Sequence, residues 1–273
     1  MSSDRHQTGP DPGVGMLCAL DTHVLVTGVA LDNELHAHWS ASVLVAAGAP
    51  FVFGSEAGGQ DDCSGVVVRP GTRQCMRTRD NRVLVVHLDP DAPEYAAVGG
   101  WIEREPWQPL PAQVRKQILA SLGPSAVLRD AAHAREVLQA VLGVLGRDEA
   151  PVLRRDSRVM RVCEQIAADP VVAPDPKTLA MSVDLSVSRL QHLFRDQLGI
   201  TLTDYARWQR IKRAGLSLQH GHSLTEAAHF GGFADSAHFS RTFRAMFGLP
   251  PSALVRGSSA VQVLFAPLKD NAA

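Results

Sequence analysis

The chain has 273 residues, of which 45% are hydrophobic and 20% are charged, an ordinary globular composition that is long enough for two domains. Its longest largely apolar run is too short to span a bilayer, and its first sixteen residues lack the apolar core of a secretion signal. The four cysteines stand apart without a Cys-x-x-Cys pair, which argues against a disulfide scaffold and against a zinc finger. We therefore expect a cytoplasmic protein with reduced thiols and no membrane contact.

The net charge of -1 conceals a difference between the two halves of the chain. Residues 1–153 carry 12 Lys or Arg against 18 Asp or Glu, whereas residues 154–256 carry 14 against 9. An acidic half joined to a basic half is the pattern expected when one domain binds a polyanion and the other must not. An excess of five charges is also common on a solvated surface. The charge alone therefore does not decide the partner.

Short β-branched segments fill the chain from Val24 to Leu88, among them HVLVTGVAL, SVLVAAG, GVVVRPG and NRVLVVHLD. Gly, Pro, Asn and Asp separate these segments at roughly regular spacing, which is typical of antiparallel β structure. We predict a small β domain over residues 1–110.

From Pro111 the hydrophobic period becomes helical, and we predict a helical segment over residues 111–147. Its two apolar stripes consist of Val114, Ile118 and Leu122, then Val137, Leu138, Val141, Leu142 and Leu145. These stripes can pack on the β domain or on a second copy of the chain, and the second option would make a homodimer. The charged residues 148–157, which include Pro151, are predicted to be a linker.

Helix signals are dense in residues 158–256. Asp175 precedes a proline as an N-cap, and Ser223 and Glu226 fit a capping box. The basic part of the chain is therefore predicted to be a run of short helices. Residues 257–273 are predicted to be a C-terminal tail.

One unit occurs twice in this part of the chain, at residues 174–199 and 223–248. Each copy reads as a short helix, a tight turn and a second helix with an (L/F)-x-x-x-F pair in its core. Gly232 permits the turn in the second copy, because glycine adopts conformations that are strained for other residues. This is the helix-turn-helix plan, in which the second helix carries polar and basic side chains into the major groove of DNA.

Residues 158–256 resemble the DNA-binding domain of the AraC/XylS family of bacterial transcription regulators. The resemblance rests on LFRDQLG, on Tyr205 followed by RIKRAGLSL, and on LTEAAHFGGFADSAHFSRTFRAMFGLPPS. Two positions depart from the family pattern: Gly231 stands where an aliphatic residue is usual, and Leu254-Val255 stands where Tyr-Arg is usual. The resemblance implies a regulator of transcription, more often an activator than a repressor, that binds promoter DNA and can contact RNA polymerase.

The resemblance also implies which side chains meet DNA. Base edges are assigned to Ser188, Gln191 and His192 in the first motif and to Ser236, Ala237, Ser240 and Arg241 in the second. Phosphates, whose contacts supply affinity without sequence information, are assigned to Arg195, Lys212, Arg213 and Arg244. Gln191 can pair with adenine and Arg241 with guanine through two hydrogen bonds each.

The β segments resemble, less specifically, the cupin-type sensor domain found ahead of many AraC-like domains, through ELHAHWSASVLVAAGAPFVF and GVVVRPGTRQCM. His36 and His38 share one face of a strand, which is how two imidazoles can share a metal. The residues expected to line a pocket for a small organic or anionic effector are His36, His38, Trp39, Arg69 and Arg73. A metal held by His36, His38 and Cys75 is the alternative to a metal-free pocket, which we prefer because the usual carboxylate and third histidine are missing.

These patterns predict an α+β protein: an N-terminal small cupin-like β-barrel with a helical segment, then an all-α domain of two helix-turn-helix motifs joined by a linker helix. The expected function is sequence-specific regulation of transcription in response to a small effector, without enzymatic activity and without a cofactor. The alternative is a cupin-type metal-dependent enzyme whose helices serve oligomerisation. That alternative leaves the paired motifs at residues 174–199 and 223–248 unexplained.

Overall fold

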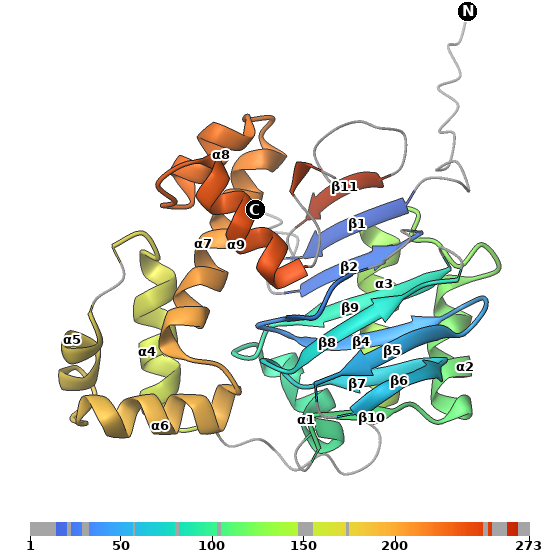
Figure 1. Cartoon of the computed structure of the whole chain (residues 1–273), viewed down its shortest axis with the longest axis horizontal. Coiled ribbons are helices and arrows are strands. Elements are labelled where there is room, and N and C mark those ends of the chain that lie inside the picture. Colours follow the sequence, from blue (N-terminus) through green and yellow to red (C-terminus); the bar gives the residue numbers. More distant parts are fainter. Residues whose placement is uncertain are drawn as a thin grey trace, which may run out of the picture.

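The structure is a computed structural model that describes residues 15–20, 23–28, 33–56, 58–79, 82–102, 105–146, 155–172, 175–247, 251–252 and 261–266. Within these ranges the chain is a mixed α+β protein, as predicted, with strands in its N-terminal part and helices in its C-terminal part (Figure 1). We call residues 15–146 together with residues 261–266 the β region, and residues 155–252 the helical region. None of the helices in the described ranges is long and apolar enough to cross a membrane.

The larger sheet has seven strands in the order β10-β7-β4-β9-β2-β1-β11. They are β1 (Gly15–Leu20), β2 (His23–Thr27), β4 (Ala41–Ala46), β7 (Gly65–Val68), β9 (Val83–Leu88), β10 (Trp107–Pro109) and β11 (Val261–Ala266). All neighbouring strands pair antiparallel except β1 and β11, which run parallel. The central strands β4 and β9 are largely apolar and buried along their whole length, as expected for a sheet that is covered on both faces.

A second sheet of four strands, in the order β3-β8-β5-β6, covers one face of the larger sheet (Figure 1). It consists of β3 (His36–Ala37), β5 (Phe51–Ser55), β6 (Gly58–Cys63) and β8 (Arg73–Arg77). Buried side chains from both sheets, among them Phe51, Met76 and Val85, form the apolar core between them. The described strands thus form two facing sheets, and their likeness to a cupin barrel stays a prediction.

Helices cover the other face of the larger sheet. They are the short helix η1 (Pro93–Tyr95), α1 (Ala96–Ile102), α2 (Ala112–Leu122) and α3 (Ala131–Leu145). The apolar stripes predicted for α2 and α3 pack into a core with the sheet of the same chain, where Ile118, Val137 and Val141 are completely buried. Because these two stripes are used within one chain, a second copy of the protein would have to bind elsewhere.

The described part of the helical region contains six helices. They are α4 (Ser157–Ala168), α5 (Pro176–Met181), α6 (Val187–Leu198), α7 (Leu202–Gln219), α8 (Leu224–Phe230) and α9 (Ser236–Phe247). Tyr205 in the first half of α7 packs with α4 to α6, whereas Trp208 and Ile211 farther along pack with α8 and α9. One helix therefore joins two small apolar cores, as the linker-helix prediction requires.

The predicted helix caps are present. The Asp175 carboxylate accepts hydrogen bonds from the backbone N–H groups of Lys177 and Thr178 at the start of α5. Ser223 and Glu226 form the capping box of α8, because the side chain of each accepts a hydrogen bond from the backbone N–H of the other. These contacts lie within a few residues of sequence, which is why the sequence alone predicts them.

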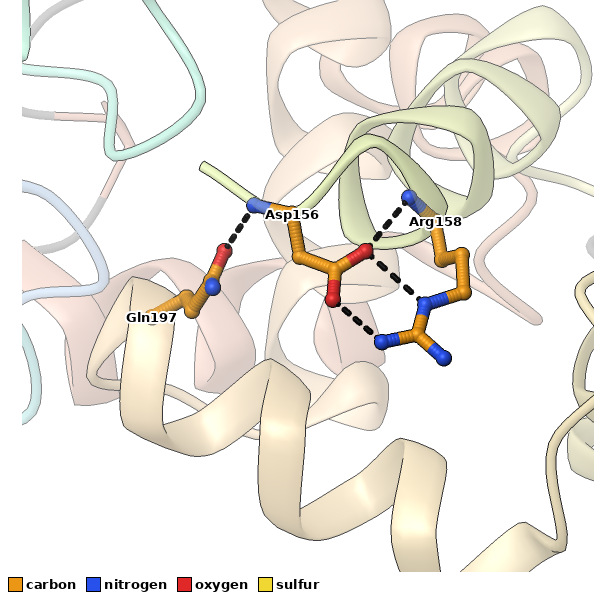
Figure 2. Close-up of polar contacts among 3 residues, drawn as sticks. All are labelled: Asp156, Arg158 and Gln197. Atoms are coloured by element: carbon orange, nitrogen blue, oxygen red, sulfur yellow. Dashed lines mark hydrogen bonds and ion pairs between the residues drawn. The ribbon is translucent and has the colours of Figure 1, made fainter. Parts of the chain in front are cut away.

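The start of α4 lies inside the segment that was predicted to be a linker. Asp156 caps this helix, and its carboxylate accepts hydrogen bonds from the backbone N–H and the guanidinium of Arg158 (Figure 2). The N–H of Asp156 donates to Oε1 of Gln197 at 2.8 Å, which ties α4 to α6. The hydrogen bonds from Arg158 lower the pKa of Asp156 to about 2. The greater part of the predicted linker, residues 148–154, lies outside the described residues.

Residues 261–266 form strand β11, whereas the sequence analysis assigned residues 257–273 to a tail. β11 pairs with β1 along its whole length, from Gly15 opposite Val261 to Leu20 opposite Ala266. The segment VQVLFA is rich in residues that favour strands, and β1 offers it the unpaired backbone groups of a sheet edge. This pairing returns the chain from the helical region to the β region.

Candidate DNA-binding surface and ligand cavity

Two helix-turn-helix units are formed by α5 with α6 and by α8 with α9. In the second unit α8 ends at Phe230 with Gly231 as its C-cap, and Gly232, with a φ of 74°, makes the turn as predicted. The side chains of Phe233, Phe239 and Phe243 are buried in the core of this unit. The concentration of phenylalanines in this segment therefore holds two short helices together.

Gly231, one of the two departures from the family pattern, lies at the contact between α8 and α7. A Cβ atom at this position would lie 2.7 Å from the carbonyl oxygen of Arg210 and 2.9 Å from Cβ of Ala214. Cβ atoms essentially never approach other heavy atoms this closely. The glycine therefore permits the two helices to approach each other, and an aliphatic side chain does not fit this packing. The second departure, at residues 254 and 255, lies outside the described residues.

The side chains assigned to base edges lie on the outer sides of α6 and α9. Exposed are Ser188, Gln191 and His192 on α6 and Ala237 and Arg241 on α9, while Ser236 and Ser240 are partly exposed. Each helix turns its apolar side inward, with Leu190 and Phe194 in the core around α6 and Phe239 and Phe243 in the core around α9. The contact of the outer side chains with DNA stays a prediction.

The four side chains assigned to phosphates divide into two pairs. The side chains of Arg195 and Arg244 are exposed. Lys212 instead forms an ion pair of 2.6 Å with Asp89 of the β region. The guanidinium of Arg213 lies 4.8 Å from the centre of the Phe230 ring. A phosphate contact by Lys212 therefore requires that its ion pair with Asp89 break.

Asp89 follows β9 and holds α7 against the β region. Its carboxylate is completely buried, accepts a hydrogen bond from Nε1 of Trp208 at 2.7 Å and lies 2.6 Å from Nζ of Lys212. Burial raises the pKa of Asp89 to about 6, although the Lys212 ammonium opposes this shift. Since a buried charge is costly to leave unpaired, the position of α7 depends on this ion pair.

A second aspartate supports the same contact. The hydroxyl of Tyr205 donates a hydrogen bond to Oδ2 of Asp91 at 2.6 Å. Tyr205, Trp208 and Lys212 are spaced by three and four residues, so they lie on one face of α7. That face contacts the β region through polar atoms, whereas the spacing of its aromatic residues in the sequence indicates only an apolar stripe.

A cavity of about 50 Å³ lies between the two sheets. The polar side chains on its wall are Asn33, His36, His38, Gln74 and His87. The other side chains on the wall are apolar, and two of them, Phe243 and Phe247, come from the end of α9. His36 and His38 were predicted to line such a pocket, and the structure brings them together with His87.

The three histidines form one group. Nε2 of His36 lies 2.9 Å from Nε2 of His38, and the ring centres of His38 and His87 lie 4.4 Å apart. Nδ1 of His87 lies 3.1 Å from Oγ of Ser42. Burial lowers the pKa of all three imidazoles, to about 3 for His87. The three rings are therefore neutral near pH 7.

His87 is absent from the predicted site residues. It lies in β9, where it shares a face with Val85, and both line the cavity. The only feature of the sequence that could have identified His87 as a site residue was its position in an otherwise apolar strand. Its partner histidines belong to a distant segment of the chain, and only the fold brings the two segments together.

Trp39, Arg69 and Arg73 are not among the residues that line this cavity, and their contact with an effector stays a prediction. Trp39 packs instead against the apolar cores of the helical region. Arg69 and Arg73 line a separate cleft of about 860 Å³, together with Arg195 of α6. Neighbouring residues on an extended segment point to opposite sides, so Arg73 is exposed while the adjacent Gln74 faces the cavity.

Cys75, the third residue of the predicted metal alternative, is not on the wall of the histidine cavity, although Gln74 and Met76 on either side of it are. Among the described residues, no group of three or more His, Cys, Asp or Glu side chains is arranged to hold a metal ion. The geometry therefore gives no support to a metal at His36, His38 and Cys75.

Known proteins match the helical region most clearly. Residues 179–257 match a family described as a helix-turn-helix domain. The chain is 40% identical over 101 residues to the arabinose operon regulatory protein of Salmonella typhimurium, an alignment that covers 36% of this chain and 35% of the relative. It is 34% identical over 86 residues to the HTH-type transcriptional activator RhaS of Salmonella arizonae, over 31% of each chain. The chain thus matches about a third of the length of these relatives.

Solved structures extend the similarity of fold to most of the chain. The structure of an apo ToxT variant from Vibrio cholerae matches with a TM-score of 0.59 and 10% identity, over 86% of this chain and 97% of that chain. A structure of ToxT with an unsaturated fatty acid bound matches with a TM-score of 0.53 and 10% identity, over 88% and 92%. At this level of identity the comparison concerns the fold alone, with strand-rich sheets followed by a helical region.

The geometry and the comparisons agree on the helical region. It contains two helix-turn-helix units joined by α7, and it includes the residues that match the helix-turn-helix family. The relatives that it matches are regulators of transcription. The helical region of this chain is therefore a helix-turn-helix domain that is similar to part of the arabinose operon regulatory protein.

Proposed function

We propose that the protein is a sequence-specific DNA-binding regulator of transcription whose β region senses a small effector. The observation that carries this proposal is the pair of helix-turn-helix units, with Gln191 exposed on α6 and Arg241 exposed on α9. Glutamine and arginine are the side chains that read adenine and guanine in the major groove through two hydrogen bonds each. Each unit thus offers one side chain suited to direct recognition of a base.

The length of α7 supports a two-part binding site. It has 18 residues and is therefore about 27 Å long at about 1.5 Å per residue. Two units that enter successive segments of the major groove on one face of straight DNA need centres about 34 Å apart, and a shorter separation bends the DNA. We propose that one chain covers about two turns of duplex and that a homodimer reads direct repeats.

The proposal gives each exposed residue a role. Base edges are read by Ser188, Gln191 and His192 on α6 and by Ser236, Ala237, Ser240 and Arg241 on α9. Phosphates are held by Arg195, Arg213 and Arg244, and by Lys212 after the helical region leaves the β region. One relative of the helical region is a transcriptional activator, which supports activation of transcription. We further propose that the protein contacts RNA polymerase in the cytoplasm.

The β region has the role of the sensor in this proposal. Residues 1–110 bind the effector, residues 111–147 pack on the sheet, and residues 158–256 bind DNA. ToxT, whose fold is similar, has a structure with an unsaturated fatty acid bound, which supports control by a small molecule. The alternative of a cupin-type enzyme leaves the two helix-turn-helix units without a role.

Selection of preferred sites from random duplex DNA by the purified full-length protein tests the proposal. We expect a motif with two half-elements about one helical turn apart. Its affinity should fall steeply between two salt concentrations, because phosphate contacts release counterions. A footprint of only about five base pairs would contradict the use of both units. No enriched motif with either the wild type or Asp89→Asn, in which Lys212 is released, would contradict DNA recognition itself.

A further inference from the structure

Two side chains on the wall of the cavity between the sheets each have a buried polar atom without a hydrogen-bond partner in the part of the chain that the structure describes. These atoms are Oε1 of Gln74, a residue that is 3% exposed, and Nδ1 of His38, a residue that is 8% exposed. Buried polar atoms in proteins are nearly always bonded, because burial without a partner is unfavourable. A cavity that carries two such atoms is therefore suited to a polar occupant.

The hydrogen bonds of His36 decide what this occupant must offer. Nδ1 of His36 lies 2.7 Å from the carbonyl oxygen of Glu34, which can only accept, so His36 carries its proton on Nδ1. Its Nε2 is then an acceptor, and Nε2 of His38, 2.9 Å away, is the donor. A neutral His38 consequently has a lone pair on Nδ1. Both unbonded atoms are acceptors, and the occupant needs two donors.

The wall of the cavity also selects for the charge of the occupant. Among the described residues, no Asp, Glu, Lys or Arg side chain lines it, and burial keeps its three histidines neutral. An ionised molecule would lose its hydration in the cavity without gaining an opposite charge. Apart from Asn33 and Gln74, the described rest of the wall, which includes Leu17, Val24 and Leu44, is apolar. The occupant is therefore uncharged and has an apolar skeleton.

The end of α9 forms part of the wall of the cavity. The ring centre of Phe247 lies 6.1 Å from that of His38, 5.9 Å from that of His87 and 4.4 Å from that of Phe243. The cavity volume of about 50 Å³ holds a few water molecules, whereas benzene occupies a cavity of about 150 Å³. A molecule the size of an aromatic ring therefore fits only if Phe247 leaves.

We propose that the cavity is a binding site for a small uncharged molecule with two hydrogen-bond donors, and that this molecule competes with Phe247 for the site. Binding then removes the contact of α9 with the histidines of the β region and releases the second helix-turn-helix unit. Docking of α9 on the β region and binding of the ligand are linked. An interaction that favours the docking therefore lowers the affinity for the ligand by the same factor by which the ligand disfavours the docking. This inference rests on the proposed function, because it assigns the effector site of that regulator.

Resorcinol is a suitable probe, because it is uncharged and carries two hydroxyl donors on one ring. Its matched control, 1,3-dimethoxybenzene, has the same ring with acceptors in place of the donors. Calorimetry with the full-length protein in the absence of DNA compares both compounds on the wild type and on Phe247→Ala. We expect resorcinol to bind Phe247→Ala at least about tenfold more tightly than the wild type, since the competing side chain is gone. The dimethoxy compound is expected to bind neither protein measurably.

Three further variants keep the test decisive. Gln74→Leu removes one acceptor and is expected to weaken resorcinol binding about tenfold in the Phe247→Ala background. Phe247→Leu retains an apolar contact with Phe243, and it replaces Phe247→Ala if the alanine variant does not fold. Phe230→Ala removes an exposed aromatic ring of α8 that does not line the cavity, and its binding should equal that of the wild type.

Equal affinity of resorcinol for the wild type and for the folded Phe247 variants would overturn the competition. Equal binding of resorcinol and 1,3-dimethoxybenzene, or no binding of resorcinol to any folded Phe247 variant, would overturn the assigned chemistry. None of these measurements contains DNA, so a failure here is distinguishable from a failure of the site selection that tests the proposed function.

Discussion

Asp89 and Lys212 form an ion pair of 2.6 Å between the β region and α7, and the Asp89 carboxylate in this pair is completely buried. Replacing Lys212 by Met removes the counter-charge and leaves the buried Asp89 carboxylate unpaired. Removal of one partner from a buried pair typically costs about 3–5 kcal/mol. We therefore expect urea unfolding of Lys212→Met to show a free energy of unfolding lower by about 3 kcal/mol, or a separate early transition of the helical region.

The control for this prediction is Asp62→Asn. Asp62 pairs with Arg79 on the surface, where both side chains are about half exposed, so its loss should cost less than about 1 kcal/mol. Equal losses for the two variants would show that the buried pair does not hold the regions together.

Release of Lys212 also has a consequence for DNA binding. Asp89→Asn is expected to bind its selected site more tightly than the wild type at low salt, because one more cation becomes available to a phosphate. The slope of log affinity against log salt concentration should become steeper by about 0.9, the value for one phosphate contact. The double variant Asp89→Asn/Lys212→Gln should lose this extra slope, and an unchanged slope in Asp89→Asn would remove Lys212 from the phosphate contacts.

Gly231→Ala tests the close approach of α8 to α7. The added Cβ would lie 2.7 Å from the carbonyl oxygen of Arg210, so one helix must shift, at a cost of about 1–3 kcal/mol. Gly143→Ala in α3 is the matched control, because a Cβ there meets nothing within 4 Å and alanine favours a helix by about 1 kcal/mol. Chemical denaturation should show opposite signs for the two variants. If both variants changed the free energy of unfolding in the same direction, Gly231 would not be required for the close approach of α8 to α7.

Replacement of Arg241 should change the sequence preference of DNA binding, whereas replacement of Arg244 should change the overall affinity for DNA. Arg241→Ala is expected to remove the preference at one base position, worth about 1–3 kcal/mol, while the other positions keep theirs. Arg244→Ala should weaken binding to all sequences alike and reduce the salt slope by about 1. Binding-site selection and salt titration with each variant distinguish the two roles. Loss of discrimination in Arg244→Ala, with none in Arg241→Ala, would reverse the assignment.

The buried histidines make the stability of the β region dependent on pH. Burial lowers the pKa of His87 from 6.5 to about 3, so between these values the unfolded chain binds a proton that the folded chain does not. The free energy of unfolding therefore falls as the pH falls below about 6.5, by about 2 kcal/mol at pH 5 for this one group. Urea unfolding of the wild type at pH 7 and pH 5 measures the loss.

Asp89 acts in the opposite direction over the same range. Its pKa is raised to about 6, so acidification from pH 7 to pH 5 protonates it in the folded state and favours folding. The comparison of wild type with His87→Gln cancels this contribution. We expect the variant to lose about 2 kcal/mol less than the wild type between the two pH values. Equal losses would mean that His87 is protonated in the folded protein.

The helical region was largely predictable because its signals are local. The N-cap of α5, the capping box of α8 and the turn at Gly232 depend on residues within one or two helical turns of each other. The face that α7 turns toward the β region was not predictable. Its partners, Asp89 and Asp91, lie more than a hundred residues earlier, and nothing in the sequence of α7 points to them.

The cavity was predictable only in part, for the same reason. Strand alternation places His36 and His38 on one face, but His87 reaches them through the pairing of distant strands. Phe247 packs against the small core of its own unit, and its ring also faces two histidines of the β region. A side chain that contacts two parts of the molecule is recognised only from the fold, because the hydrophobic period of its own helix indicates only one of the two contacts.

Strand β11 limits how far the helical region can travel. Residues 248–260 separate the end of α9 from β11, and a chain of this length spans at most about 50 Å when fully extended. A tether of that reach keeps the local concentration of the helical region at its own docking surface in roughly the millimolar range. Return to the docked arrangement after dissociation of the proposed ligand is then intramolecular and independent of protein concentration.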